Sequence, residues 1–273
     1  MRLQIKNIIR NLVPPIVFRA LIGLLSRQNK FEGPFKSWEE AVENSSGYDQ
    51  DLILDKVLNS TMKVMSGDAA GERDSVVLDE VEYTWPVTSG LMCAAAANKG
   101  RLHVLDFGGS LGSAYFQNRN FLGFTTEFSW SVIEQPHFAG AGRAYIQDEN
   151  IKFYDSISKC LLENTPNVIL LGSVLQYLKE PSPILGALAE TGALIIVDRT
   201  PISDNADEFI LVQKVPASIY PASYPIRILN EKNIIPAGYV KVAKFQSPEG
   251  KMTKKGCSFT WSGFILEPIS NQK

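Results

Sequence analysis

The sequence has few of the residues that build metal centres and disulfide frameworks. Among its 273 residues are only two histidines and three cysteines, Cys93, Cys160 and Cys257, at scattered spacings. An odd number of widely spaced cysteines is typical of reduced thiols. Two histidines are too few for a multi-histidine metal centre. We therefore expect neither a disulfide framework nor a metal site.

The chain also lacks a strong imbalance of charge. Its formal net charge is −2, and charged residues make up 21% of the sequence. This composition gives no indication of the broad basic surface that binds nucleic acid. With 45% hydrophobic residues, a chain of this length can bury one large core, with or without an appendage.

Long apolar runs are missing as well. Residues 1–30 hold six basic residues and no acid, and Arg19 and Pro14-Pro15 interrupt their apolar residues. Such a segment is too broken for a spanning helix, and no small-residue cleavage site of a signal peptide follows it. It is expected either to dock on the protein's own core or on a second subunit of a homodimer, or to lie on an anionic membrane surface. The expected location is the cytoplasm, with peripheral contact to the inner face of the cytoplasmic membrane in the second case.

The sequence pattern changes near residue 100. Residues 1–99 are predicted to form an N-terminal helical extension, with Ser37 and Glu40 as a capping box and residues 67–80 as a loop. In residues 100–273, apolar strand patterns alternate with helical ones, which predicts an α/β domain with a doubly wound parallel sheet. The predicted strands are 102–107, 128–134, 151–155, 167–173 and 193–200, followed by an insertion near 203–228 and two antiparallel strands, 238–245 and 257–267, with a polar, lysine-rich loop between them.

A glycine-rich turn follows the first of these strands, in the segment DFGGSLGS at 106–113. A dinucleotide site needs G-x-G-x-x-G, but this segment has D-x-G-x-x-x-G, with Ser110 at the usual middle glycine. Asp106 in the turn would also repel a pyrophosphate, which argues against an NAD-dependent oxidoreductase. The acid suits a cofactor with a cationic amino-acid end and no phosphate, such as S-adenosylmethionine.

The next strands end in polar residues that suit the same cofactor. Glu134 is placed to accept hydrogen bonds from two ribose hydroxyls, Asp155 to reach the adenine amino group, and Ser173 to lie near the sulfonium and methyl group. Simpler roles stay open, as a solvated charge for the two acids and as a helix cap for Ser173. The candidate cofactor-binding residues are Asp106, Gly108, Gly109, Ser110, Gly112, Glu134, Gln135, Asp155 and Ser173.

These motifs resemble those of the class I S-adenosylmethionine-dependent methyltransferases. VLDFGGSLGS is similar to their first motif, VIEQPHF to their second-strand signature and VILLGSVLQYLKEP to their fourth-strand segment. The resemblance covers about residues 100–200 and 239–267. It implies a Rossmann-like sheet of seven strands, mostly parallel, with an antiparallel C-terminal strand.

A narrower resemblance covers nearly the whole chain. The segments ERDSVVLDEVEYTWP, LDFGGSLGSAYFQNR and DRTP look like those of a bacterial family of predicted methyltransferases associated with capsule and O-antigen polysaccharide gene sets. This resemblance implies methyl transfer to a surface glycan or to its precursor, a nucleotide sugar or a lipid-linked chain.

Transfer to a sugar hydroxyl releases a proton, so a general base is expected. Asp198, at the end of the fifth predicted strand, is the first candidate and His137 the second. Arg199 would hold an anionic group, unless Asp198 and Arg199 form a structural ion pair. The candidate substrate-binding residues are Tyr177, Arg199, Lys214, Tyr220 and Tyr224, although the tyrosines in the insertion also suit lid packing. A further group of residues precedes the first predicted strand of the sheet, and two roles stay open for it. These residues either cover the cofactor's methionine end or only cap the sheet edge: Glu72, Arg73, Asp74, Tyr83 and Trp85.

The sequence therefore predicts a metal-independent O-methyltransferase that uses S-adenosylmethionine. The alternative from another class is a catalytically silent module of the same fold, which anchors a polysaccharide-assembly complex through residues 1–30. The serine at position 110 and the lack of a strong histidine base keep this alternative open.

Overall fold

The computed structural model describes residues 30–46, 50–73, 75–216 and 222–269. Two candidate site residues, Tyr220 and Asp74, lie outside the described residues. So do residues 1–29, on which the interpretations of membrane contact and docking depend. In the described part of the chain, no helix combines the length and the apolar character needed to cross a membrane.

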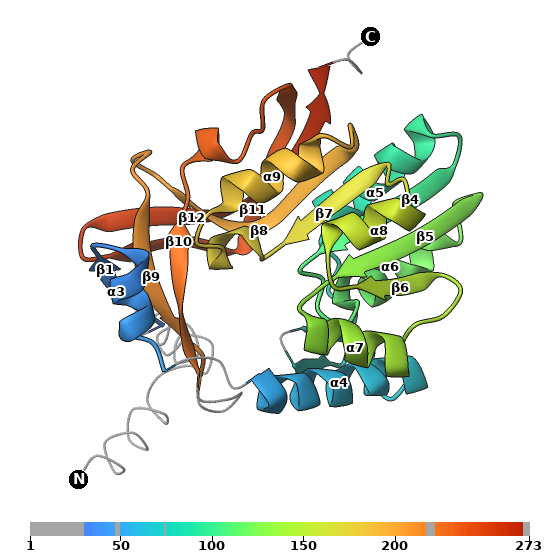
Figure 1. The fold of residues 1–273 in the computed structure, drawn as a ribbon, viewed down its shortest axis with the longest axis horizontal. Helices are drawn as coiled ribbons and strands as arrows, with labels where there is room; N and C mark the ends of the chain where they lie inside the picture. Colours follow the sequence, from blue (N-terminus) through green and yellow to red (C-terminus); the bar gives the residue numbers. More distant parts are fainter. Residues whose placement is uncertain (1–29, 47–49, 74, 217–221, 270–273) are drawn as a thin grey trace, which may run out of the picture.

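Seven of the described strands form one sheet, in the order β11-β12-β8-β7-β4-β5-β6 (Figure 1). All pairs from β8 to β6 are parallel, whereas β12 runs antiparallel to both of its neighbours. This is the predicted Rossmann-like sheet with an antiparallel C-terminal strand. The strands are β4 (Arg101–Phe107), β5 (Glu127–Ile133), β6 (Ile151–Tyr154), β7 (Val168–Gly172), β8 (Leu194–Ser203), β11 (Tyr239–Lys254) and β12 (Cys257–Pro268).

Of the strands of this sheet, β4 comes first in the sequence, and it lies inside the sheet between β5 and β7. From β4 the chain moves outward through β5 and β6, then returns to the other side of β4 for β7 and β8. The connections after β4 and β7 therefore leave in opposite directions, and a crevice opens at the carboxyl ends of these strands. Ligands of open α/β sheets bind at such a switch point.

Alternation along the strands gives the sheet two apolar faces. Leu170 and Ile196 join the core cluster that α5 (Trp85–Ala97), α6 (Ser113–Leu122) and α7 (Pro136–Tyr145) help to form. Their neighbours Leu171 and Val197 join the cluster with α8 (Ile157–Glu163) and α9 (Pro181–Ala189). The side chains on both faces of β7 and β8 are therefore buried, which explains the continuous apolar sequences of these two strands.

Three further strands form a separate sheet, which we call the cap sheet. Its order is β1-β9-β10, and all of its pairs are antiparallel (Figure 1). The strands β9 (Phe209–Lys214) and β10 (Ser223–Ile228) are the predicted insertion, whereas β1 (Phe31–Phe35) comes from the N-terminal part of the chain. The buried side chains of Phe31 and Leu211 pack with Phe259 of β12, which joins the cap sheet to the main sheet.

The N-terminal part contains the predicted helices and also strands that were not predicted. Helix α3 (Trp38–Glu43) starts at Ser37, whose Oγ accepts a hydrogen bond from the Glu40 backbone N–H, as expected for this capping sequence. Helix α4 (Gln50–Ser66) follows. The loop prediction for residues 67–80 is wrong, because β2 (Gly71–Arg73) and β3 (Val76–Leu78) pair there as a hairpin. Helix α8 was also not predicted.

The C-terminal strand pair also differs from the prediction. The predicted lysine-rich loop is wrong, because β11 continues through it to Lys254 and pairs with β12 almost to the turn. The extra residues are taken up by a bulge in β11, in which residues 247–250 lie opposite the single residue Trp261. We call these four residues the β11 bulge.

A second bulge lies in β8, at the end nearest the crevice. Asp198 and Arg199 together lie opposite the single residue Gly263 of β12. A side chain at position 263 would collide with the Phe245 ring and with the Val197 backbone oxygen, 2.7 Å from an added Cβ. The glycine therefore lets β11 and its aromatic ring pack closely over β12 and onto β8.

Gly263→Ala is expected to lower the free energy of unfolding by about 1–3 kcal/mol, because overpacking forces neighbours out of place. Urea unfolding measures this change. The matched control is Gly186→Ala in α9, where an added Cβ meets no atom within 4 Å. In a helix interior this change is expected to stabilise by about 0.5–1 kcal/mol. An equal response of both variants would contradict the packing role of Gly263.

Candidate functional site

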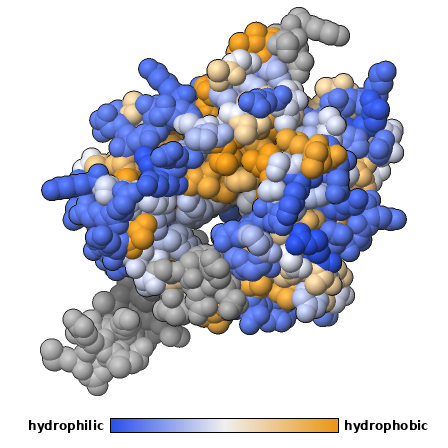
Figure 2. Space-filling model, viewed as in Figure 1, coloured by the Kyte–Doolittle hydropathy of each residue, from blue (hydrophilic) through white to orange (hydrophobic). Residues whose placement is uncertain are grey.

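A cavity of about 1210 Å³ opens at the carboxyl ends of the parallel strands. The β4–α6 turn and the ends of β5, β6, β7 and β8 form its floor, and the β2–β3 hairpin and part of β10 form its sides. Figure 2 shows the surface hollowed between the cap-sheet side of the molecule and the side that carries β4 to β6. The crevice expected from the strand order is therefore a real cavity.

Asp106 lies at the base of this cavity, buried at the end of β4 with 1% of its surface exposed. The indole Nε1 of Trp130, on the neighbouring strand, donates a hydrogen bond to its Oδ2 at 3.0 Å. Burial raises the pKa of Asp106 to about 7, against the opposing effect of this hydrogen bond. A Cβ at Gly109 would lie 2.5 Å from the carboxyl carbon, so only glycine can cover the buried acid.

Glu134 follows β5 and is held by the turn that begins over Asp106. Its Oε1 accepts a hydrogen bond from the Ser110 backbone N–H at 3.1 Å, and its Oε2 accepts one from the Gln135 N–H at 2.9 Å. Burial raises the pKa of Glu134, and the two amide donors oppose this shift. Each carboxylate oxygen has two acceptor sites, so Glu134 can still accept hydrogen bonds from a ligand in the cavity.

Four non-glycine residues with left-handed backbone line the cavity. Ser75 lies in the β2–β3 hairpin and has a φ angle of 68°. Ser110 follows β4, Ser173 follows β7 and Arg199 lies in the β8 bulge, with φ angles of 54°, 57° and 50°. Such conformations cost energy and cluster at binding and catalytic sites. The Ser173 N–H donates to the Asp198 backbone oxygen at 2.9 Å, and the Ser173 Oγ accepts a hydrogen bond from Gln176 Nε2 at 2.9 Å.

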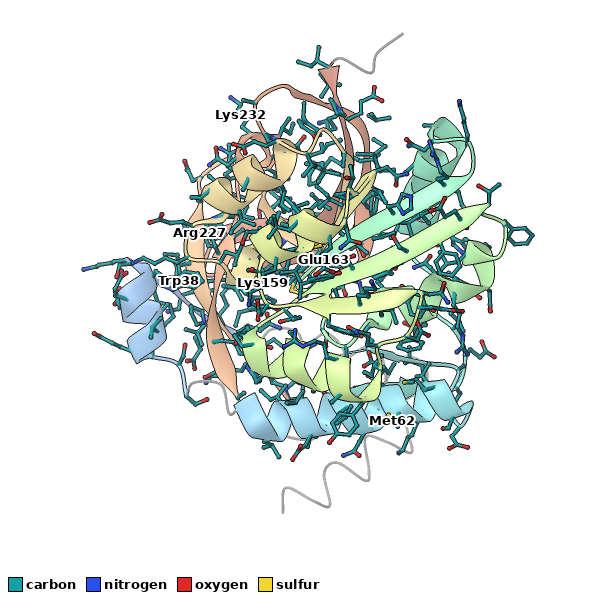
Figure 3. The ribbon with its side chains drawn as sticks, turned by 45° about the vertical axis from the view of Figure 1, so that its right-hand side comes forward. Trp38, Met62, Lys159, Glu163, Arg227 and Lys232 are labelled. Carbon is teal, nitrogen blue, oxygen red and sulfur yellow. The ribbon has the colours of Figure 1, made fainter. Side chains whose placement is uncertain are left out.

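Asp155 lies at the rim of the cavity, after β6. Its carboxylate pairs with Lys159 of α8 at 2.7 Å, and the hydrogen bond from this lysine lowers the pKa of Asp155. Figure 3 shows Lys159 and Glu163 on the same helix, in front of the strands. A ligand at Asp155 would therefore share the carboxylate with an exposed cation.

Asp198 and Arg199 both line the cavity, because the β8 bulge breaks the usual alternation of side chains. Arg199 Nε lies 3.7 Å from Asp198 Oδ2, and Arg199 Nη1 lies 3.4 Å from Glu249 Oε1. Ser247 Oγ donates to Asp198 Oδ1 at 3.3 Å. Burial raises the pKa of Asp198, and the guanidinium of Arg199 opposes this effect. The ion pair considered from the sequence is present, and it lies within the cavity wall.

Ser247 and Glu249 were not predicted as site residues. Both belong to the β11 bulge, in a segment that the sequence analysis interpreted as a loop. The signal that could have found them is S-P-E-G at 247–250, which interrupts an otherwise continuous strand pattern.

Two of the three tyrosines predicted to bind substrate belong to the described residues, and the structure brings these two together. The rings of Tyr177 and Tyr224 meet edge to face with centroids 5.3 Å apart, and both line the cavity. Tyr177 Oη donates to Gln213 on β9 at 3.2 Å. Together the two rings form the wall of the cavity on the side of the cap sheet.

Two other candidates lie away from the cavity lining. His137 packs its ring against Phe138 with centroids 5.0 Å apart, and its Nε2 is buried without a hydrogen-bond partner among the described residues. Lys214 forms an ion pair with Glu32 between β9 and β1. Lys214 therefore lies away from the other candidates, whereas the charge interaction of His137 with Glu134, which lowers the pKa of this carboxyl, places His137 near the cofactor candidates but outside the lining.

The β2–β3 hairpin brings Glu72 and Arg73 to the cavity. Glu72 is buried and accepts a hydrogen bond from Ser113 Oγ at the start of α6. Arg73 pairs with Glu82 at 2.7 Å. By contrast, Tyr83 and Trp85 form an aromatic cluster with Phe121 outside the cavity lining.

The buried carboxyl group of Asp106 predicts a specific dependence of stability on pH. The unfolded chain releases this proton near pH 3.8, whereas the folded protein keeps it to about pH 7. The stabilising contribution is therefore complete below the lower value and is lost as the pH rises through the higher one. We expect the free energy of unfolding to fall between about pH 5 and 8 more steeply in the parent than in Asp106→Asn. Urea unfolding across this range tests the difference, and parallel curves would contradict it.

Comparison with known proteins gives only distant structural similarities. No protein-family model matches the chain, and no curated protein matches it. Among solved structures, the N-terminal domain of EvdMO1, in the presence of SAH and D-fucose, is 12% identical with a TM-score of 0.46 over 81% of this chain and 97% of that chain. The O-methyltransferase NcsB1 from neocarzinostatin biosynthesis is 15% identical with a TM-score of 0.44, over 68% of this chain and 53% of that one.

A third similar structure is an S-adenosylmethionine-dependent methyltransferase from Clostridium acetobutylicum. It is 9% identical to this chain, with a TM-score of 0.43 over 78% of this chain and 98% of its own. These similarities are distant, so what the site does has to be argued from its own residues.

Proposed function

We propose that this protein is an S-adenosylmethionine-dependent O-methyltransferase that acts on a sugar hydroxyl of a bacterial surface polysaccharide or of its precursor. The observation that carries the proposal is the position of three carboxylates. Asp106, Glu134 and Asp155 end three neighbouring parallel strands and line one cavity beside a glycine turn. Acids at this point disfavour a pyrophosphate and suit a ligand with an ammonium and a sulfonium group.

The residues of the turn fit such a cofactor. Gly108 and Gly109 present only backbone to the cavity, so a ligand can approach closely. Glu134, fixed by two backbone amides, is the group suited to accept hydrogen bonds from a pair of ribose hydroxyls. When bound, the cofactor would supply an activated methyl group on a good leaving group. The protein's own task is then mainly to orient the acceptor.

Asp198 is the residue best suited to accept the proton of the acceptor hydroxyl. Its carboxylate faces the cavity, and burial raises its pKa, which makes it a stronger base than an ordinary aspartate. Ser247 and Arg199 hold it in position from two sides. His137, the other base considered from the sequence, does not line the cavity.

The sugar acceptor is supported by the sequence resemblance to capsule and O-antigen methyltransferases and by the nature of the wall near Asp198. Tyr177 and Tyr224 offer aromatic surface and hydroxyl groups, which together suit a ligand with both apolar C–H faces and polar groups. The resemblance and the two tyrosines both support a carbohydrate acceptor.

Glu134→Ala is expected to weaken binding of S-adenosylhomocysteine by about 1–3 kcal/mol, because charge-assisted hydrogen bonds are lost. Isothermal titration calorimetry measures the affinity. The matched control is Glu127→Ala, which removes an exposed carboxylate from the opposite end of β5 and is expected to bind like the parent.

The same titration separates the alternatives. An NAD-dependent oxidoreductase would not bind S-adenosylhomocysteine, and a catalytically silent module would bind it weakly or not at all. If the parent binds but Glu134→Ala binds equally well, the cofactor site is wrongly assigned.

Asp198→Asn is expected to lower turnover by roughly 10²–10⁴-fold, because the shape is kept and the proton acceptor is lost. Cofactor affinity and thermal stability are expected to stay near the parent values. Methyl transfer from radiolabelled cofactor, measured beside calorimetry and thermal unfolding, tests all three. Turnover within about threefold of the parent would exclude Asp198 as the base. Loss of folding or of cofactor binding would instead identify it as a structural partner of Arg199.

A further inference from the structure

We infer that the acceptor site takes an uncharged sugar unit and excludes anionic acceptors such as nucleotide sugars, and that Glu249 is a residue that determines this specificity. The inference rests on the proposed function and narrows its substrate class. It follows from the charges of the cavity wall and from the partners of Arg199.

The charges of the described cavity lining are strongly unbalanced. Seven carboxyl groups and two guanidinium groups line the cavity, and the described lining contains no lysine or histidine. Even without Asp106, which keeps its proton to about pH 7, six acids face two cations. Lys159 offsets Asp155 from α8, at the far rim. A bound S-adenosylmethionine has an ammonium, a sulfonium and a carboxylate group, so its single net positive charge would compensate only part of the remainder. An acceptor with phosphate groups would therefore enter a wall of like charge, which is costly where water is partly excluded.

Both guanidinium groups of the lining already have carboxylate partners. Arg73 pairs with Glu82 at the β2–β3 hairpin. Arg199 lies between Asp198 and Glu249, at 3.7 Å and 3.4 Å, and its side chain is only 13% exposed. An anionic acceptor would have to compete with these carboxylates for either cation, and it would be repelled by them. This arrangement opposes the role in anion binding that the sequence analysis considered for Arg199.

The position of Glu249 depends on both bulges. The β11 bulge brings Ser247 and Glu249 toward β8, and Gly263 leaves the space over β12 through which β11 packs. Glu249 Oε2 is buried and has no hydrogen-bond partner among the described residues. The Glu249 side chain is 31% exposed as a whole, and its backbone is fixed in the sheet by the bulge, which places the negative charge beside Arg199.

A neutral sugar fits this wall better, because its hydroxyl groups donate hydrogen bonds and carboxylates accept them. A nucleotide sugar carries its phosphates on the sugar itself, within one small molecule. In a glycan chain, a sugar unit can enter the cavity while any phosphate stays outside. The geometry therefore favours an acceptor that is already part of a saccharide chain.

The test measures the binding of uridine diphosphate glucose and of inorganic pyrophosphate to the full chain saturated with S-adenosylhomocysteine. The parent is expected to bind neither anion detectably at about 1 mM. Glu249→Gln, which keeps the shape and releases Arg199, is expected to bind them at least about tenfold more tightly, since a change of about 1.4 kcal/mol corresponds to tenfold. Calorimetry measures both.

The matched control is Glu190→Gln, which removes one negative charge from the same lining without releasing a guanidinium. It is expected to bind the anions like the parent. In the double variant Arg199→Gln/Glu249→Gln, the increase in anion affinity is expected to disappear, because the anion would bind to Arg199. The double variant thus separates specific binding at Arg199 from a folding defect caused by Glu249→Gln.

Tight binding of uridine diphosphate glucose to the parent would overturn the inference while leaving the proposed function intact. Equal anion affinity of Glu249→Gln and the parent would overturn the role of Glu249. Failure of the parent to bind S-adenosylhomocysteine would instead overturn the proposed function, and this is measured first.

Discussion

The arrangement of the site depends on one carboxyl group that is buried where a strand ends. Asp106 has almost no contact with water, so its environment must supply a donor and must leave no gap above it. Trp130 supplies the donor from the next strand, and Gly109 closes the space with backbone alone. The turn over the buried acid then presents the amide of Ser110 to Glu134. Two carboxylates at neighbouring strand ends are thus linked by a single turn, and the pKa of each is raised mainly by burial.

A second constraint acts at the other side of the switch point, where irregular sheet geometry replaces a turn. The bulge in β8 directs two consecutive side chains, Asp198 and Arg199, to one cavity. The bulge in β11 places Glu249 against Arg199, behind the lining. Regular strands would have directed Asp198 and Arg199 to opposite faces of the sheet. The result is a carboxylate, a guanidinium and a second carboxylate in fixed order, held by strands on both sides. Sites built on strands are more precisely positioned than sites on loops.

Much of the fold could be predicted from the sequence because its signals are local. Continuous apolar runs such as VILLG indicate buried parallel strands, and the glycine turn after β4 lies at the predicted residues. Features that depend on distant partners could not be predicted in this way. β1 becomes a strand by pairing with β9, Glu249 reaches the site through a bulge, and His137 turns toward Phe138 at the start of α7. The acids at the strand ends could be recognised in the sequence, because each directly ends an apolar strand pattern. The contact of Glu249 with Arg199 could not, because it depends on how β11 packs in three dimensions.

The pairing of β1 with β9 has a consequence for how the protein is made. Glu32 and Lys214 are 182 positions apart in the sequence, yet they pair across these two strands. During synthesis the N-terminal strand leaves the ribosome long before its partner exists, so its edge waits unpaired while the parallel sheet grows. The cap sheet can close only after β9 and β10 have emerged, so the wall that holds Tyr224 is completed late. Non-local pairing of this kind slows folding, and unpaired strand edges favour aggregation. The cap-sheet side of the cavity is therefore completed late in folding, and until then its strand edges are exposed to wrong pairing.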